Sequence, residues 1–326
     1  MSSDLTLVTG VTGTIGSALV SELLEQGRPV RCLVRDVAKA EEMRLGVAEF
    51  VKGDLTNKAS IADAFQDVTH VFHAGGMPEQ WAADDSIFDR VNVGGTRHMV
   101  DVALTCGVKS FVYTSTQDMF DLTADPFDET MPGKVPLHSA YERSKQKAEA
   151  IVARAVAGGL PAKFVHPVAV YGPGAAEVSG LNNLLNDLLC NKVPILLNGG
   201  LPVVYNHDLA KGQLLVEAQA MPGDHYIFSD SYQSLIDIAQ GVQNIEPEAS
   251  IPKVMPDILA GLIAGTGELI SKITGSKPPI SKGELGVLQR AGRPSSAKAR
   301  SKLGWSSRSF EDGLAEALTW LKERNR

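Results

Sequence analysis

The stretch Leu5-Thr6-Leu7-Val8-Thr9-Gly10-Val11-Thr12-Gly13-Thr14-Ile15-Gly16 decides the fold of this chain. Its first five residues are apolar or β-branched and predict a buried strand, and the three glycines then recur at every third position. A glycine-rich turn between a first strand and a first helix leaves backbone amides free to hold a pyrophosphate at the positive end of the helix. We therefore predict a dinucleotide-binding turn here, in preference to an ordinary glycine-rich turn.

Apolar runs of strand length alternate with segments of helix length through the first half of the chain. The expected strands are 5–9, 30–34, 71–73, 111–114 and 163–167, and the expected helices are 17–26, 61–65, 96–105 and 141–157. Short continuous apolar strands separated by helices are typical of a parallel sheet covered on both faces. We predict an α/β fold: a doubly wound parallel Rossmann sheet with a smaller, mostly helical C-terminal substrate lobe.

The alternation ends after Tyr171-Gly172-Pro173-Gly174. A chain of 326 residues exceeds the size at which one core stops growing, so we expect two packed units. The NADP-binding Rossmann domain is expected at 1–170, with sheet contributions from about 203–240, and the substrate lobe at 171–202 and 241–326. Within these parts we expect strands near 203–205 and 226–229, helices near 181–189 and 310–322, and a boundary loop at 271–282.

Composition limits the partners and the compartment. The formal net charge is −7, and no basic block could follow a phosphate backbone, so we expect no nucleic acid. The three cysteines, Cys32, Cys106 and Cys190, are widely spaced and odd in number, which favours neither disulfides nor a metal site and suits the cytoplasm. The first strand leaves no room for a secretory signal, and the nearly uncharged stretch from Ile258 to Gly267 is too short to span a membrane.

The end of the second strand predicts which dinucleotide is bound. Arg35 and Asp36 follow the last glycine of the turn by about twenty residues, where dinucleotide folds contact the adenosine ribose. An arginine at this place pairs with a 2′-phosphate, whereas an acidic residue accepts a hydrogen bond from a 2′-hydroxyl. Because Arg35 comes first and Lys39 follows, we favour NADP(H) over NAD(H). The alternative is that Arg35 is an ordinary surface arginine and Asp36 caps the next helix.

Tyr141 and Lys145 form a candidate proton-transfer pair. Residues four apart share one helix face, so the Lys145 ammonium can stand beside the Tyr141 phenol and lower its pKa. A lowered pKa brings a phenol toward the range useful for acid and base catalysis. The same spacing arises by chance in many chains, so the pair gains meaning only from the motifs around it.

Seven short motifs occur in the order found in one family, and the chain resembles an extended short-chain dehydrogenase/reductase of the NAD-dependent epimerase/dehydratase superfamily. The ending Gly292-Arg293-Pro294 with Leu303-Gly304-Trp305 is similar to that of the dihydroflavonol reductase and 3β-hydroxysteroid dehydrogenase-like branch. The seven motifs are Thr9-Gly10-Val11-Thr12-Gly13-Thr14-Ile15-Gly16, Gly53-Asp54-Leu55, His73-Ala74-Gly75, Val91-Asn92-Val93-Gly94-Gly95-Thr96, Val112-Tyr113-Thr114-Ser115-Thr116, Tyr141 with Lys145, and Pro167-Val168-Ala169-Val170-Tyr171-Gly172-Pro173-Gly174.

The resemblance implies a role for each motif. Tyr141 would give a proton to a carbonyl oxygen, Lys145 would lower the Tyr141 pKa and bind the nicotinamide ribose, and Asn92 would keep a water or backbone relay in place. The implied cofactor contacts run from the pyrophosphate through the adenine to the nicotinamide. They are Gly10, Thr12, Gly13, Thr14, Ile15, Gly16, Arg35, Lys39, Asp54, Leu55, His73, Ala74, Gly75, Ser115, Tyr141, Lys145, Pro167, Val168 and Val170.

The third catalytic hydroxyl lies in Thr114-Ser115-Thr116, where the family pattern has a run of serines. Alignment from Val108 onward puts the last of the three at the substrate-orienting position, so we expect Thr116 to act there, with Ser115 as the alternative.

The expected reaction is NADP(H)-dependent interconversion of a ketone or aldehyde and an alcohol on a moderately apolar small molecule. The strand entrance Leu201-Pro202-Val203 lacks the arginine usual in sugar-nucleotide enzymes, which favours an apolar substrate. Two alternatives stay open: a nucleotide-sugar epimerase or dehydratase, and a non-catalytic NADP(H) sensor. Family members often pair through the helices carrying Asn92 and Tyr141, so a homodimer is expected. Asp208 is expected to cap the helix that it begins.

Overall fold

A computed structural model describes residues 4–46, 49–79, 81–133, 139–261, 263, 285–286, 288 and 292–326. The boundary loop expected at 271–282 lies outside these residues.

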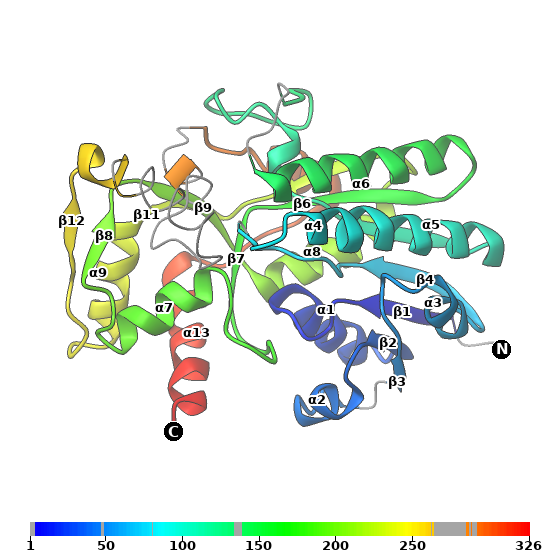
Figure 1. Ribbon diagram of the computed structural model, residues 1–326, viewed down its shortest axis with the longest axis horizontal. Helices are drawn as coiled ribbons and strands as arrows, with labels where there is room; N and C mark the ends of the chain where they lie inside the picture. The colour runs from blue at the N-terminus through cyan, green and yellow to red at the C-terminus, as the bar shows by residue number, and fades with distance from the viewer. Residues whose placement is uncertain are drawn as a thin grey trace.

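The centre of the molecule is a seven-stranded sheet in the order β10-β6-β5-β4-β1-β2-β3 (Figure 1), and all its neighbouring strands run parallel. The order reverses between β1 and β4, so a crevice opens there at the carboxyl ends of the strands. The predicted doubly wound Rossmann sheet is confirmed. Its strands are β1 Leu5–Thr9, β2 Val30–Val34, β3 Glu49–Lys52, β4 Val68–His73, β5 Ser110–Thr114, β6 Ala162–Pro167 and β10 His225–Phe228.

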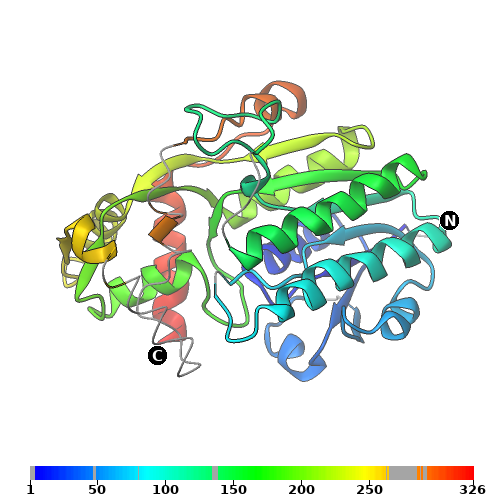
Figure 2. The same cartoon turned by 45° about the horizontal axis from the view of Figure 1, so that its top comes forward.

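Helices cover both faces of this sheet. On one face α1 (Thr14–Glu25) packs against α8 (Asn206–Gln219), and on the other α5 (Gly95–Cys106) lies beside α6 (Ala140–Ala157), as Figure 2 shows. None of the helices in the described part of the chain is both long and apolar enough to cross a membrane. The shorter elements of this half are α2 Val37–Glu42, α3 Lys58–Ala64, α4 Ser86–Phe88, the π-helical turn η1 Asp89–Gly94 and the 3-10 turn η2 Gln117–Met119.

A second group of elements packs around its own apolar core, which includes Tyr171, Leu185 and Leu314. It holds a three-stranded sheet in the order β11-β9-β7 and a pair of parallel strands, β8 and β12. The bounds are β7 Ala169–Tyr171, α7 Leu181–Leu189, β8 Ile195–Leu197, β9 Gly200–Tyr205, β11 Ser231–Ser234, α9 Leu235–Ile245, β12 Lys253–Met255 and α13 Phe310–Arg324.

Two expectations about which segments join the central sheet or pack on it need correction. The strand near 226–229 joins the central sheet as β10, but the run 203–205 belongs to β9, which pairs with β7 and β11 instead. An apolar run looks the same whichever sheet it enters, so the pattern could not separate these outcomes. In addition, α12 (Ala297–Leu303) packs on α8 and β10, so this part of 241–326 lies against the Rossmann sheet.

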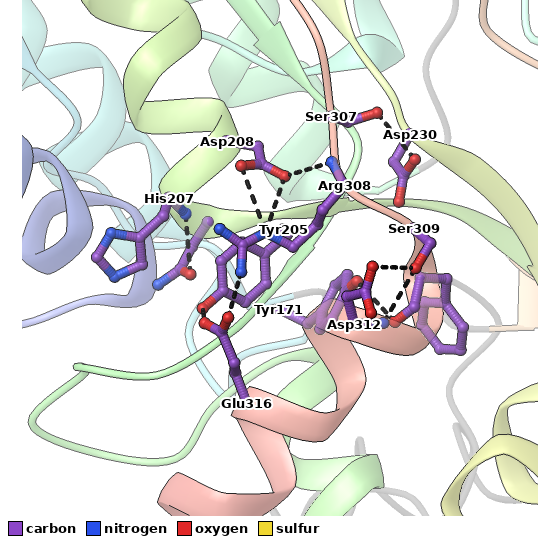
Figure 3. Close-up of polar contacts among 12 residues, drawn as sticks. Tyr171, Tyr205, His207, Asp208, Asp230, Ser307, Arg308, Ser309, Asp312 and Glu316 are labelled. Atoms are coloured by element: carbon purple, nitrogen blue, oxygen red, sulfur yellow. Dashed lines mark hydrogen bonds and ion pairs between the residues drawn. The ribbon is translucent and has the colours of Figure 1, made fainter.

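An ion-pair network ties the C-terminal segment to the start of α8 (Figure 3). Asp208 accepts hydrogen bonds from the backbone N–H of Arg308 at 2.8 Å and from its Nε at 3.2 Å. The Arg308 guanidinium also lies 4.0 Å from the Tyr205 ring centre and pairs with Glu316 of α13. The expected capping role of Asp208 is wrong, because the residue at the N-cap is Tyr205 and the first-turn N–H of His207 donates to Asn206 Oδ1. Asp208 instead joins the second core to the first.

We predict that Arg308→Ala lowers the free energy of unfolding by about 2–3 kcal/mol, because it leaves the buried Asp208 carboxylate without its cation. Urea denaturation measures the change. The matched control is Lys322→Ala, which breaks the more exposed pair with Glu246 and should cost less than about 1 kcal/mol. Equal losses in the two variants would contradict this role for Arg308.

Candidate active site

The glycine-rich turn is folded against itself and against the end of β4. Gly10 has φ +77°, and a Cβ at this position would lie 2.7 Å from the carbonyl oxygen of Ala74. A Cβ at Gly16 would lie 2.3 Å from the carbonyl oxygen of Gly10, whereas one at Gly13 would stand at 3.4 Å. Real side chains do not approach a backbone oxygen as closely as the first two values require. Glycine at positions 10 and 16 is therefore a packing requirement.

The N-terminus of α1 offers an anion site. Gly13 occupies the N-cap, and no side chain caps the helix there. The first amides of α1 therefore keep their hydrogen-bonding capacity at the positive end of the helix, beside the crevice of the sheet. This arrangement fits the pyrophosphate of a dinucleotide, as the sequence predicts for Gly10, Thr12, Gly13, Thr14, Ile15 and Gly16.

Three further predicted cofactor residues meet at the same crevice. The backbone N–H of Gly75 donates to Thr9 Oγ1 at 2.9 Å, which fastens the end of β4 to the end of β1. A Cβ on Gly75 would lie 3.0 Å from Leu55 Cδ1, so Leu55 borders the same surface. The carboxylate of Asp54 accepts from the N–H and hydroxyl of Thr56, both at 2.8 Å, and so shapes its own turn.

The imidazole of His73 holds the sheet together and is turned away from the crevice. It bonds the hydroxyls of Thr9 at 2.8 Å and Thr96 at 3.1 Å, and its residue is 1% exposed. Burial, with the nearby Lys145 charge, lowers the pKa of His73 to about 3. Because both ring nitrogens are used by the two threonines, the predicted cofactor contact of His73 stays a prediction for its backbone.

Arg35 lies exposed just after β2. Asp36 caps α2 by accepting from the backbone N–H of Lys39 at 3.2 Å, so its carboxylate has a structural partner. The Lys39 ammonium forms an ion pair with Glu177.

Thr116 and Tyr141 are brought together at the carboxyl end of β5. The Thr116 hydroxyl lies close enough to the Tyr141 phenol to lower its pKa, and it donates a hydrogen bond to Asp118 Oδ2 at 2.9 Å. The hydroxyl of Ser115, by contrast, donates to Glu149. Of the two candidates, Thr116 is therefore the one beside the phenol.

The electrostatics of Tyr141 differ from the prediction. Burial raises its pKa, with the Asp118 carboxylate adding to the effect. The Lys145 ammonium donates to the Thr114 carbonyl at 2.8 Å and the Tyr113 hydroxyl at 3.2 Å, and burial lowers the pKa of Lys145 to about 8. The expected lowering of the Tyr141 pKa is thus wrong for this arrangement, because the ammonium is directed at Thr114 and Tyr113 while burial of the phenol raises its pKa.

Asn92 lies in the π-helical turn η1, a kind of distortion often found at functional sites. Its amide oxygen accepts from the Met77 N–H at 2.7 Å, and its amide nitrogen donates to Met77 O at 3.2 Å and Ser144 Oγ at 2.9 Å. Ser144 in turn donates to the Tyr141 carbonyl at 2.7 Å. Asn92 thereby links the loop after β4 to the helix that carries Tyr141.

The remaining predicted residues lie where β6 ends beside β5. The Ser115 N–H donates to Val165 O at 2.7 Å, which sets Pro167 and Val168 just beyond the catalytic segment. Val168 is buried, and Val170 packs against the same apolar core.

Sequence reasoning missed Tyr113, Glu149 and His166. Tyr113 contacts the Lys145 ammonium through both its hydroxyl and its ring face, at 4.7 Å from the ring centre. Glu149 repeats the four-residue spacing of Tyr141 and Lys145 along α6, a signal that was present in the sequence. His166 sits alone on a strand and gave no such signal.

Comparison with known proteins places the chain in a family. Residues 6–227 match the model of the NAD dependent epimerase/dehydratase family. The chain belongs to this family. Its relatives make it an NAD(P)-dependent enzyme of the extended short-chain dehydrogenase/reductase type, so the resemblance drawn from the motifs is confirmed.

Two curated relatives and one solved structure are similar over nearly their whole lengths. A putative dihydroflavonol 4-reductase of Synechocystis is 28% identical, over 98% of this chain and 95% of the relative. Sterol demethylase protein B of Methylococcus capsulatus is 27% identical over 98% of both chains. The crystal structure of gox2253 superposes with a TM-score of 0.86 at 28% identity, covering 99% of both chains.

We predict that Gly16→Ala lowers the free energy of unfolding by about 2 kcal/mol or more, because its methyl group must displace the Gly10 carbonyl. Gly13→Ala is the matched control and should stay within about 1 kcal/mol of the wild type, since its Cβ finds an ordinary contact. Thermal and urea unfolding of both variants measure the difference. A Gly13→Ala protein as unstable as Gly16→Ala would show that close approach is not the cause.

Proposed function

We propose that the protein is an NADP(H)-dependent oxidoreductase that interconverts a ketone or aldehyde and an alcohol on a moderately apolar small molecule. The observation that carries the proposal is the contact between Thr116 and Tyr141, with the buried Lys145 one helical turn further along α6. The Thr116 hydroxyl, the Tyr141 phenol and the Lys145 ammonium thus lie near the carboxyl ends of the strands, where the glycine-rich turn also lies. A bound nicotinamide would supply the hydride.

In this proposal the side chains of Thr116 and Tyr141 both hydrogen-bond the carbonyl oxygen of the substrate. The raised pKa of Tyr141 keeps the phenol protonated at neutral pH, so that it is ready to donate. As negative charge develops on the carbonyl oxygen, the Thr116 hydroxyl turns its hydrogen from Asp118 to that oxygen, and Tyr141 transfers its phenolic proton to it. The Lys145 ammonium stabilises the phenolate that is left.

Two features support NADP(H) as the cofactor. Asp36 is committed to capping α2, so it is poorly placed to accept from a ribose 2′-hydroxyl. Arg35 is exposed at the end of β2, where a guanidinium can form a bidentate pair with a 2′-phosphate.

The substrate class rests on composition and on the relatives. The entrance residues Leu201 and Pro202 of β9 carry no charge that would attract a diphosphate. The relatives named as a dihydroflavonol reductase and a sterol demethylase protein point to fused-ring carbon skeletons with an oxygen function. We also infer that two copies of the chain pair through α5 and α6, which lie side by side on one face of the sheet. These are the helices through which we expect family members to form homodimers.

We predict that Tyr141→Phe lowers kcat for carbonyl reduction by at least about 10²-fold, because the proton donor is lost. Thr116→Ala should lower kcat by about 10²-fold, while Thr116→Ser keeps most of the activity since it retains the hydroxyl. The measurement is NADPH consumption with a panel of apolar ketones, together with NADPH affinity as a check on folding.

Two results would contradict this assignment. Full activity in Thr116→Ala with loss in Ser115→Ala would move the orienting hydroxyl to Ser115. Turnover of UDP- or dTDP-sugars without net consumption of NADPH would replace the proposed reaction with that of an epimerase or dehydratase.

We predict that Arg35→Ala weakens NADPH binding by about tenfold or more and leaves NADH binding nearly unchanged, because only NADPH carries the 2′-phosphate. Isothermal titration of both nucleotides measures the two affinities. Arg97→Ala, which removes an exposed arginine on α5, is the matched control and should change neither. Parallel losses for both nucleotides in Arg35→Ala would argue against 2′-phosphate recognition.

A further inference from the structure

A buried polar cluster lies behind the catalytic segment, on the face of the sheet covered by α6. Glu149 comes from α6, His166 from β6 and His225 from the edge strand β10, and one ligand-type atom of each lies within 4.8 Å of the others. We call these three residues the edge cluster. None of them has a part in the proton transfer described above.

The hydrogen bonds of the edge cluster fix the tautomers of its two histidines. His166 Nδ1 lies 3.0 Å from the carbonyl oxygen of Thr116, which can only accept, so Nδ1 carries the hydrogen. His166 Nε2 is then an acceptor, and His225 Nδ1, 2.9 Å away, donates to it. Burial lowers the pKa of His166 to about 3 and that of His225 to about 4, so both rings stay neutral near pH 7.

The His166 and His225 rings are arranged for a shared hydrogen rather than a shared metal ion. Their planes differ by 17° and their centres lie 5.2 Å apart, a separation reached when the two bonded nitrogens face each other along the line of centres. A tetrahedral zinc ion with Zn–N bonds of about 2.0–2.1 Å would hold its two nitrogens about 3.3 Å apart and off the line between the ring centres, whereas the observed nitrogen–nitrogen distance is 2.9 Å.

The edge cluster holds two residues of the segment that carries the catalytic hydroxyl, and Lys145 holds the third. Glu149 accepts from the Ser115 hydroxyl, and His166 donates to the Thr116 carbonyl. Lys145, one turn before Glu149 on α6, donates to the Thr114 carbonyl. Three consecutive residues are thus held from behind by three different side chains, which leaves the Thr116 hydroxyl beside Tyr141 and Asp118.

The charge of Glu149 also acts on Lys145. The groups that surround the ammonium are Glu149 on its own helix, Tyr113 and the Thr114 carbonyl on β5, His73 on β4 and His166 on β6. The two histidines are neutral, so Glu149 is the group among these that carries a negative charge when ionised. Burial raises the pKa of Glu149, and the hydrogen bond from Ser115, with the Lys145 charge, opposes that rise. The Glu149 charge raises the pKa of Lys145 against the larger lowering caused by burial.

We propose that the edge cluster is a positioning network for the active site: Glu149 holds Ser115 and acts on Lys145 from one turn further along α6, and His225 locks His166 in the tautomer that holds the Thr116 carbonyl. This proposal rests on the proposed function only where its tests measure activity. Proton transfer itself stays with Tyr141 and Lys145, and the three residues of the edge cluster act through them.

The first test is the pH profile of Glu149→Gln, which keeps the shape and the acceptor for Ser115 but removes the charge. Activity that needs the ammonium is high below the pKa of Lys145 and falls as the pH rises through it. Loss of the carboxylate lowers that pKa, so the alkaline fall of kcat/KM should move to lower pH by about one unit. At a given pH above the pKa, kcat/KM should therefore be about tenfold lower than in the wild type. Glu217→Gln, a similarly buried glutamate paired with Arg28, is the matched control and should leave the profile in place.

The second test separates positioning from packing at His166. His166→Leu removes the donor and should lower kcat by about tenfold with KM unchanged. His166→Asn places an amide N–H near the position of Nδ1 and should restore most of the loss. NADPH affinity and melting temperature verify that both variants fold.

Three outcomes would overturn the proposal: superimposed pH profiles for Glu149→Gln and wild type, equal kcat in His166→Asn and His166→Leu, or activity that is lost on chelation and restored by Zn²⁺. An NMR titration of the Lys145 side chain reads its pKa without any substrate. Suppose that the Lys145 pKa is lower in Glu149→Gln but that the wild-type protein reduces no carbonyl compound. The positioning network would then be supported, and the proposed function would be rejected.

Discussion

The close approach of backbone to backbone at the start of α1 is the constraint on which the rest of the structure depends. Gly16 lies against the carbonyl of Gly10, and Gly10 against the carbonyl of Ala74, so the first helix sits directly on the ends of β1 and β4. Since strand order reverses between these two strands, the same contact creates the crevice and places an uncapped helix end beside it. The central sheet is thus positioned for a dinucleotide before any side chain takes part.

Desolvation dominates the chemistry at the other side of this crevice. It keeps the phenol of Tyr141 protonated and brings the ammonium of Lys145 to a pKa of about 8, where its charge responds to single neighbouring groups. A buried cation is costly unless it is paired, and here the Tyr113 hydroxyl, the Thr114 carbonyl and the charge of Glu149 share that task. The residues that tune the site are therefore found behind it, on α6 and β6.

The sequence predicted the bounds of single helices and strands better than it predicted which strands pair with one another. The strands at 5–9 and 30–34 and the helix at 181–189 were predicted at their observed bounds, because apolar periodicity and glycine turns are local signals. The edge strand β3 was missed because its residues are half-exposed and carry charges at both ends. The run at 203–205 was assigned to the wrong sheet, since strand pairing depends on contacts with residues far away in the chain.

The fold class, the glycine-rich turn and the residue types of the candidate catalytic group follow from spacing along the chain and can be predicted without coordinates. Three-dimensional packing was needed to show that Thr116, and not Ser115, lies beside Tyr141, that the His73 ring is buried between β1 and α5, and that Asp208 binds Arg308. It also decided the protonation of the site. Desolvation and hydrogen bonding depend on what surrounds a group in space, and the neighbours of Lys145 come from three separate strands and its own helix.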